Sequence, residues 1–326
     1  MKSLNSRNAD KALSLYNHSI RSGEQNLKLL SKQEFIDLFL SPSKGNRTFA
    51  SYTDDENGFV IGTYDGGIDR FFLTMIVVDP AYRRRGYGTH LVDHLQYQMD
   101  ELSGQLCRKI PPMEISYFDP VNIRWILPGT KGHTHQNSQG VKLGSGAHLF
   151  FKNLGFRDFS TQNTYHLLLS DYEWPKTKLE VYEERVKKAG FSIEFYDASK
   201  HTGMQEVVDD LNNDLWNWQI PQEMNRPDGP RPIVIVNDHG HIGGFAGPIV
   251  VEEDGRCWLL GVAVHSKCRG SGCATLLFNQ MCQAYKDAGA VYLTLFTGED
   301  NPARKIYESA GMKILYSWAT MRRTGR

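Results

Sequence analysis

Apolar positions along the chain recur in two similar runs. In the first run, alternating or continuous apolar stretches predict strands at residues 47–53, 58–65 and 70–78. In the second run, residues 232–238, 241–251 and 257–264 have the same character. In each run a helical pattern follows the third strand, with apolar residues every three or four positions. Each half therefore reads helix, helix, three strands, loop and helix, strand, helix, strand.

Strands in a meander followed by strand, helix and strand predict a layered unit. Such an order is typical of a mixed sheet with helices on its faces, an α/β (α+β layered) architecture. Because the order occurs twice, the predicted fold class is two consecutive α/β domains. We expect an N-terminal domain at 1–170, a linker helix at 171–190 and a C-terminal domain at 191–326.

A sequence repeat supports the division into two halves. The segment VDPAYRRRGYGTHLV (78–92) aligns without a gap with VHSKCRGSGCATLLF (264–278). A second pair, AHLFFKNLGF (147–156) and ARKIYESAGM (303–312), aligns at a smaller offset. The two offsets, 186 and 156 residues, differ by 30, so the first half contains an insertion of that length. Most of it falls at 121–146, a segment that glycines and a proline interrupt repeatedly.

Composition excludes several classes of protein. Apolar residues make up 40% of the chain and charged residues 23%, which is typical of a folded globular protein. The 37 basic and 37 acidic residues give no overall field that would attract nucleic acid or an anionic membrane. No apolar run approaches the roughly 20 residues of a membrane span. We therefore expect a cytoplasmic protein without nucleic-acid or membrane partners.

Cysteine and histidine spacing gives no sign of a disulfide framework or a metal site. The five cysteines include no C-x-x-C pair, so we expect reduced thiols. His133 and His135 lie close together, but neither a cysteine nor a carboxylate is found at ligand spacing. No metal is expected.

The repeated loop has the features of a phosphate-binding site. A strand ends in R-x-x-G-x-G/A, and a helix begins directly afterwards. Glycines let the backbone approach a ligand closely, and the amides at a helix N-terminus attract negative charge. Cationic side chains in the two loops would complement a pyrophosphate. They are Arg83, Arg84 and Arg85 in the first loop and Lys267 and Arg269 in the second.

These segments resemble the GNAT superfamily of N-acetyltransferases. VDPAYRRRGYG and VHSKCRGSGCA are similar to the acyl-CoA pyrophosphate loop of that family, and NPARKIYESAGM is similar to its next helix. The resemblance covers nearly the whole chain as two consecutive domains. It implies acetyl-CoA or a close thioester as co-substrate, bound where the fourth and fifth strands splay apart. It also implies a small-molecule or peptide amine as acceptor.

The resemblance implies CoA-binding residues in both halves. In the first half they are Ile76 and Val78 for the pantetheine arm, with Arg83, Arg84, Arg85, Gly86, Tyr87, Gly88 and Thr89 for the pyrophosphate. In the second half they are Val262 and Val264, then Arg269, Gly270, Ser271, Gly272, Cys273, Ala274 and Thr275, with Asn301 and Arg304 at the next helix. A backbone amide near Val264 would polarise the thioester carbonyl.

The family's general acid is often a tyrosine on the helix after the fifth strand, and Tyr307 has that place. Phe151 has the same place in the first half and cannot donate a proton. We therefore expect chemistry in the C-terminal domain, by direct attack of the amine on the thioester. Tyr117 is an alternative donor in the first half. The base is left open among a water relay and five side chains, His265, Glu252, Glu253, Glu299 and Asp300.

Two further expectations concern assembly and the insertion. The alternative function is a non-catalytic acyl-CoA sensor or scaffold. We expect the chain to be a monomer or a homodimer. The 121–146 insertion follows the fifth strand, so we expect it to cover the first domain's acceptor side or the interdomain groove. Trp125 would anchor it by burial, with His133 and His135 nearer its tip.

Overall fold

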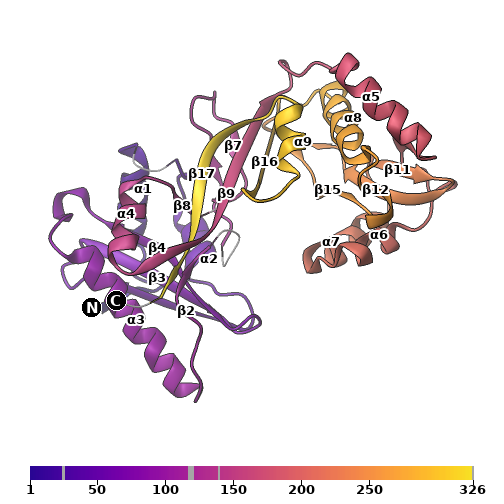
Figure 1. The fold of residues 1–326 in the computed structure, drawn as a ribbon. Helices are drawn as coiled ribbons and strands as arrows, with labels where there is room; N and C mark the ends of the chain where they lie inside the picture. The colour runs from indigo at the N-terminus through magenta and orange to yellow at the C-terminus, as the bar shows by residue number, and fades with distance from the viewer. Residues whose placement is uncertain (24–25, 117–120, 139, 325–326) are drawn as a thin grey trace. The chain divides into compact units, whose positions relative to one another are not determined.

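The computed structural model describes residues 1–23, 26–116, 121–138 and 140–324 (Figure 1). The chain divides into two compact units. The first unit comprises Met1–Thr164 and Leu315–Arg326, and the second comprises Tyr165–Ile314. Both are layered α/β structures, the first on a mixed sheet and the second on an antiparallel sheet, so the predicted α/β fold class is confirmed.

The first unit is built on a mixed sheet. Its strand order is β1 (Lys2–Ser3), β2 (Asn46–Tyr52), β3 (Gly58–Asp65), β4 (Arg70–Val78), β5 (Glu114–Ile115), β17 (Lys313–Arg323) and β9 (Phe156–Leu168). β2, β3 and β4 form an antiparallel meander, and β5 runs parallel to β4. The three strands predicted at 47–53, 58–65 and 70–78 are confirmed.

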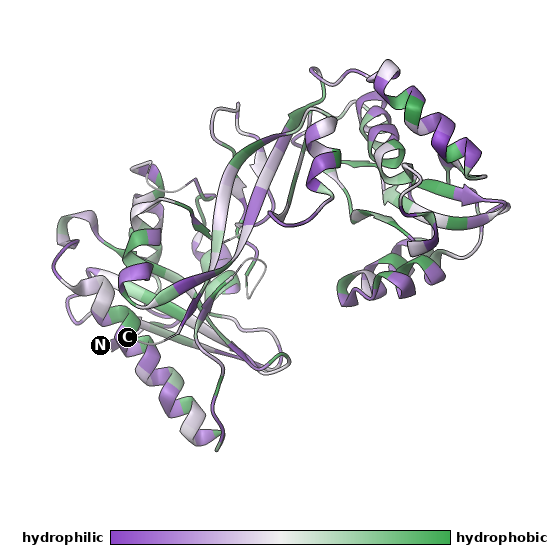
Figure 2. Ribbon diagram, in the orientation of Figure 1, coloured by the Kyte–Doolittle hydropathy of each residue, from purple (hydrophilic) through white to green (hydrophobic). Residues whose placement is uncertain are grey.

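Helices cover both faces of this sheet because consecutive residues of β3 are apolar. Val60 packs in the cluster under α3 (Tyr87–Gln105). Phe59 and Ile61 point the other way, toward α1 (Asp10–Arg21) and α2 (Lys32–Phe39). In Figure 2 apolar and polar residues alternate along α3, as expected of a helix with one buried face.

Among the described residues, β4 and β5 share one ladder pair, near the start of each strand. The parallel pair joins Phe72 with Glu114, and β5 ends one residue later. β4 also contains a β-bulge, because Leu73 pairs with Gly62 while Met75 pairs with the neighbouring residue Ile61. Thr74 is thus the extra residue in the ladder. The bulge thus lies two residues after Phe72, the residue of β4 that pairs with β5 in the described part of the chain.

The strand beside β5 is the last strand of the sequence, β17. Met321 pairs with Ile115, and Trp318 pairs with Lys142 of β8 (Val141–Lys142). Arg322 donates a hydrogen bond of 2.9 Å to the carboxylate of Glu114, which is 1% exposed. The expected domain division gave residues 191–326 to one domain. The structure differs because the last strand pairs and packs within the first unit.

The insertion forms short strands around a buried tryptophan. β6 (Trp125–Ile126) pairs with β7 (Thr134–His135), and β8 and α4 (Gly146–Asn153) follow. Trp125 is 1% exposed, so its predicted role as anchor is confirmed. The expectation that His135 lies nearer the tip is wrong. His135 pairs with Trp125 and is buried, with its Nδ1 3.0 Å from the carbonyl oxygen of Asn137.

The second unit contains an antiparallel sheet in the order β10 (Ser192–Phe195), β11 (Val234–Asp238), β12 (His241–Gly247) and β15 (Gly261–Val264). Two of its expected strands are interrupted. The stretch 241–251 divides into β12 and β13 (Val250–Val251), because Pro248 has no amide hydrogen to continue a ladder. The stretch 257–264 divides into β14 (Cys257–Trp258) and β15.

Helices also cover both faces of this sheet. Ile235 packs with α6 (Met204–Leu211) and α7 (Asp214–Met224), whereas Val234 and Val236 face the cluster of α8 (Cys273–Asp287). β16 (Tyr292–Gly298) and α9 (Arg304–Ser309) follow α8. The helix expected as a linker is α5 (Lys176–Lys188), and it packs against α8 through Leu179 and Val186.

Candidate active site

The first repeated loop ends in a glycine at the start of a helix. After β4 a 3₁₀ turn, Pro80–Tyr82, leads to Arg83, and α3 begins after Gly86. Gly86 has a φ of +88°, a conformation that favours glycine, and no atom lies within 4 Å of the position that a Cβ would occupy. Gly86 is exposed, whereas in the first turn of α3 the ring of Phe150 lies 2.9 Å from the position that a Cβ on Gly88 would occupy.

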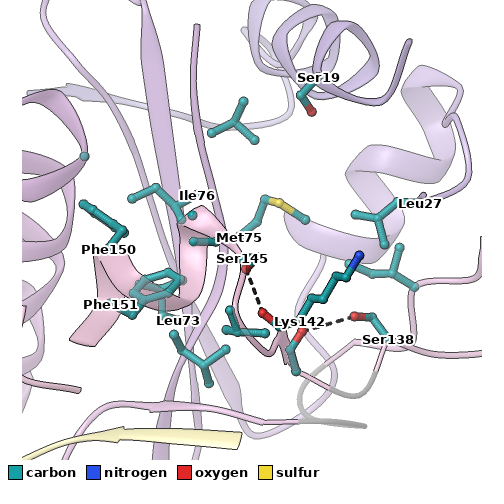
Figure 3. A pocket seen from close by; sticks show the side chains of 18 of the residues that line it. Ser19, Leu27, Leu73, Met75, Ile76, Ser138, Lys142, Ser145, Phe150 and Phe151 are labelled. Carbon is teal, nitrogen blue, oxygen red and sulfur yellow. Dashed lines mark hydrogen bonds between the residues drawn. The ribbon is translucent and has the colours of Figure 1, made fainter. Parts of the chain in front are cut away.

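A cavity of about 700 Å³ adjoins this loop within the first unit (Figure 3). β4 forms one wall from Leu73 to Val78, and Arg83, Arg84 and Gly88 of the loop contribute to the lining. The other walls come from α4, from β17 and from the insertion, which includes Trp125. The insertion thus lines the first unit's cavity.

Five of the nine CoA-binding residues expected in the first half line this cavity, namely Ile76, Val78, Arg83, Arg84 and Gly88. The others are held elsewhere or lie beside it. The guanidinium of Arg85 lies over the ring of Tyr82, at 5.5 Å from its centroid. Tyr87 donates a hydrogen bond to Asp55, and Thr89 lies in the first turn of α3.

The charged side chains among the described residues of the cavity lining are basic. Among its described lining residues are three cations, Arg83, Arg84 and Lys142, and no carboxylate. The described residues also contain no group of three His, Cys, Asp or Glu side chains that could hold a metal ion. The three cations suit anionic groups.

An aromatic group from the last strand completes one wall. Tyr316 and Trp318 of β17 line the cavity together with Phe151, which has the place expected for a general acid. The ring of Tyr316 stacks on Trp125 with centroids 5.6 Å apart and an interplanar angle of 9°. Asn26 donates a hydrogen bond of 3.1 Å from its Nδ2 to the phenol oxygen of Tyr316.

Sequence reasoning missed Tyr316 because the repeat assigned it to the other half. Its spacing from Trp318 does place both side chains on one face of a strand. The two-residue spacing shows that Tyr316 and Trp318 share a face of the strand, but it does not indicate which sheet the strand joins. Tyr117, the alternative donor considered for the first half, lies outside the described residues.

In the second repeated loop a side chain lies beside the glycine at the helix start. Gly272 precedes α8 as Gly86 precedes α3, but a Cβ on Gly272 would lie 2.8 Å from Cδ1 of Tyr182 on α5. About one turn earlier on α5, Lys178 donates a hydrogen bond of 3.2 Å to the carbonyl oxygen of Ser309, the last residue of α9. α5 therefore contacts both helices between which the family resemblance implied an acyl-CoA.

The cation of the second loop faces an acid. Arg269 lies 3.6 Å from Asp210 of α6, and Asp210 also accepts hydrogen bonds from the backbone and side chain of Ser266. These hydrogen bonds hold the pKa of Asp210 below its usual value, so the carboxylate is charged at neutral pH. It would oppose a bound phosphate.

The remaining residues expected in the second CoA site have structural partners or pack at its core. Cys273 is buried, and Val262 and Val264 pack against the unit's core cluster. Ser271 donates a hydrogen bond to the carbonyl oxygen of Cys268. The other expected residues make local contacts or none of these kinds. They are Gly270 on the exposed turn, Ala274 and Thr275 in the first turn of α8, and Asn301 and Arg304 around the start of α9.

Tyr307, the expected general acid, lies among aromatic rings. Its centroid is 5.0 Å from that of Phe278 and 5.9 Å from that of Tyr165. Burial raises the pKa of Tyr307 to about 12, which makes proton donation at neutral pH harder. Two of the open base candidates are also engaged. His265 accepts a hydrogen bond from the amide of Lys267, and Glu252 pairs with Arg256.

The separated fourth and fifth strands and the glycine loop at a helix N-terminus are features of an acyltransferase fold. The chain belongs to the acetyltransferase (GNAT) family, whose model matches residues 13–110 and 165–312. The two matched regions confirm the resemblance inferred from the repeated loop. Among curated proteins, no sequence matches this chain.

Solved structures show the same fold across the whole chain. One neighbour is a GCN5-related glucosamine N-acetyltransferase region of a fungal multi-domain β-N-acetylglucosaminidase, with a TM-score of 0.62 and 15% identity over 98% of this chain. The match covers 37% of that protein, so this chain corresponds to about a third of its length.

Two further neighbours match along nearly their whole length. A GCN5-related N-acetyltransferase from Sphaerobacter thermophilus has a TM-score of 0.58 and 16% identity, covering 100% of this chain and 96% of its own. A tandem GNAT protein from the clavulanic acid biosynthesis pathway has a TM-score of 0.56 and 13% identity, covering 98% and 96%. Identities this low show the tandem fold and nothing about the acceptor. No described helix is both long and apolar enough to cross a membrane.

Proposed function

We propose that this protein is an acyl-CoA-dependent N-acyltransferase, with acetyl-CoA as donor, and that the chemistry takes place in the first unit. Membership of the GNAT family supports acyl transfer in general. The observation that carries the choice of unit is the open loop at Gly86 beside a cavity of about 700 Å³. The sequence favoured the second domain through Tyr307, but the contacts of Tyr182 and Arg269 argue against an acyl-CoA site there.

The donor supplies an acyl group on a thioester, and the first unit has groups that fit it. Arg83, Arg84 and the first amides of α3 would hold the phosphates. Ile76 and Val78 would lie along the pantetheine arm. Thr74 lines the cavity at the bulge, so its backbone amide is the group we assign to the thioester oxygen.

Tyr316 is the group we assign to protonate the departing thiolate. It lines the cavity, and its oxygen already accepts a hydrogen bond from Asn26, so the phenol hydrogen is available to another partner. The described lining contains no carboxylate that could serve as base. In our proposal a neutral amine attacks directly and releases its proton to water.

Thiol release from acetyl-CoA, followed with a panel of amines, tests this function. An acyltransferase releases CoA only when an amine acceptor is present, and the acylated amine is detected by mass spectrometry. CoA binding without release with any amine would favour the non-catalytic sensor or scaffold. Absence of both CoA binding and release would reject the proposal for this chain.

A further inference from the structure

One helix of the second unit has the exposed composition of a protein interface. We propose that two copies of this chain associate through α7, with Trp218 of each copy inserted into a pocket beside α7 of the other. The two α7 helices would run antiparallel about a two-fold axis. This inference does not depend on acyl transfer.

The exposed face of α7 is apolar at its centre. Trp218 is 63% exposed, more than any other large apolar side chain that the structure describes. Leu215 precedes it by three residues, so it lies on the same face of the helix, and it is 49% exposed. α7 is described throughout, and its other exposed residues are Asp214, Asn217 and Gln222. The centre of a protein interface is typically rich in tryptophan and poor in charge, as this face is.

A pocket of about 400 Å³ lies beside the same helix. Its lining includes Met204 at the start of α6 and Ile220, Pro221 and Met224 near the end of α7. Figure 1 shows α6 and α7 next to each other in the second unit. Pro221 is three residues after Trp218, so one edge of the pocket and the exposed tryptophan share a face of α7. Apolar linings of this kind suit an aromatic ring.

A second copy of the chain fits this face because Trp218 and the pocket belong to the same helix. In its own chain, Trp218 does not line the pocket. In an antiparallel pair of α7 helices, each Trp218 would contact the partner subunit's Pro221 and the partner subunit's Asn225, which line the pocket. Each copy would thus bury its tryptophan and fill the pocket of the other.

The charges at the two ends of α7 match in this arrangement. Asp214 is four residues before Trp218, so it would lie opposite the chain just past the end of the partner subunit's α7, where Arg226 is found. The side chain of Arg226 is 39% exposed. It lies 4.0 Å from Glu223, and that carboxylate binds Arg231 more closely, at 2.9 Å. Because of the two-fold symmetry, opposite charges would meet at both ends of the pair.

This contact is closed and small. Each copy uses its tryptophan and its pocket on the same partner, so the assembly ends at two chains. α7 has 11 residues. At 1.5 Å per residue it spans about 17 Å, and a contact of that length buries less than the roughly 800 Å² per partner of a standard interface. We therefore expect a dissociation constant in the micromolar range.

Sedimentation equilibrium of the full chain tests the association. Concentrations from about 1 to about 200 µM bracket a micromolar constant, and the wild type should show a monomer–dimer equilibrium across them. Trp218→Ala should weaken the dimer roughly 30-fold or more, the usual loss for a tryptophan at the centre of an interface. Tyr97→Ala removes a 58% exposed aromatic ring from α3 and is the matched control, which should change nothing.

An exchange of charges tests the antiparallel arrangement. Asp214→Arg alone and Arg226→Asp alone should each weaken the dimer about tenfold, because like charges would meet at both ends. The double variant should recover the wild-type constant. If Asp214→Arg acted only by removing the acid from the first turn of α7, the second change would not restore the dimer, because Arg226 lies past the other end of the helix.

The remaining outcomes overturn the inference. A wild type that is monomeric over the whole range would leave this face to a different partner. A dimer that survives Trp218→Ala, assemblies larger than two chains, or a double variant that does not recover would each exclude the proposed contact. None of these outcomes changes the proposed function, because the described lining of the first unit's cavity includes no residue of α7.

Discussion

The two halves contain the same loop sequence pattern in different surroundings. At Gly86 no atom lies within 4 Å of the position that a Cβ would occupy, and a cavity lined by three cations adjoins the loop. At Gly272 the ring of Tyr182 fills the equivalent space, and Asp210 faces the loop's arginine. A phosphate-binding motif thus shows where a helix begins after a strand. Whether the loop can bind a phosphate depends on side chains from other parts of the chain, such as Tyr182 and Asp210, which are not part of the motif.

The largest difference that we expect concerns two phenols. Tyr316→Phe should lower kcat by roughly 10²-fold to 10⁴-fold, the usual loss of a general acid, with CoA affinity unchanged. Tyr307→Phe should leave kcat within twofold, because Tyr307 packs among rings in the second unit. Steady-state kinetics of the two variants decide the matter. If Tyr307→Phe is the variant that loses turnover, the chemistry belongs to the second unit.

The next largest difference that we expect is the effect of charge reversal in each loop on CoA affinity. The pair Arg83→Glu and Arg84→Glu should weaken CoA binding about 100-fold, since two charge-assisted contacts are replaced by repulsion. The matched pair Lys267→Glu and Arg269→Glu should change it less than twofold. Calorimetric titration with CoA measures both. Equal losses in the two pairs would contradict the difference between the loops.

A smaller effect should appear in alkaline stability. The raised pKa of Tyr307, about 12, means that the fold favours the neutral phenol. The associated stability is complete below pH 10, the ordinary pKa of tyrosine, and is lost as pH rises from 10 toward 12. Tyr307→Phe should remove this loss, which is about 2 kcal/mol at pH 12. Urea unfolding at pH 9, 10, 11 and 12 compares the variant with wild type, and parallel curves would show that the phenol is not held neutral by burial.

The smallest effect should follow from opening the second loop. Wild-type protein should bind one CoA per chain. Tyr182→Ala removes the ring beside Gly272 and should add a second, weaker site, while the first keeps its affinity within twofold. The stoichiometry from calorimetry reports this directly. Tyr196→Ala, in another part of the second unit, controls for general loosening, and a stoichiometry of two in the wild type would show that α5 does not exclude the ligand.

Much of this architecture was predictable because it depends on local patterns. The meander strands, the loops and the helices that follow them are determined by apolar periodicity and glycine positions, and β2, β3 and β4 agree with their predicted ranges. The burial of Trp125 was also predictable, since a large aromatic residue in an irregular segment needs a packing partner.

Long-range pairing was not predictable from the same patterns. The repeat aligned 303–312 with 147–156, so the strand that follows was assigned to its own half. In the structure this strand, β17, instead pairs with β5 of the first unit. Met321 pairs with Ile115, and Arg322 donates a hydrogen bond to the buried carboxylate of Glu114. The contact between Tyr182 and Gly272 was not predictable for the same reason. The spacing of residues in α5 predicts a polar helix, but it does not indicate which loop that helix packs against.

The position of β17 has a consequence for synthesis of the protein. Residues 315–323 leave the ribosome about 150 residues after Thr164, the last residue of the first unit's long segment. At ordinary translation rates that is a delay of roughly 10 to 30 s. During this interval β5 lacks its neighbour, and the carboxylate of Glu114 lacks Arg322. The first unit is thus synthesised first but completed last. Nascent chains should therefore depend on chaperones that shield its unpaired sheet edge.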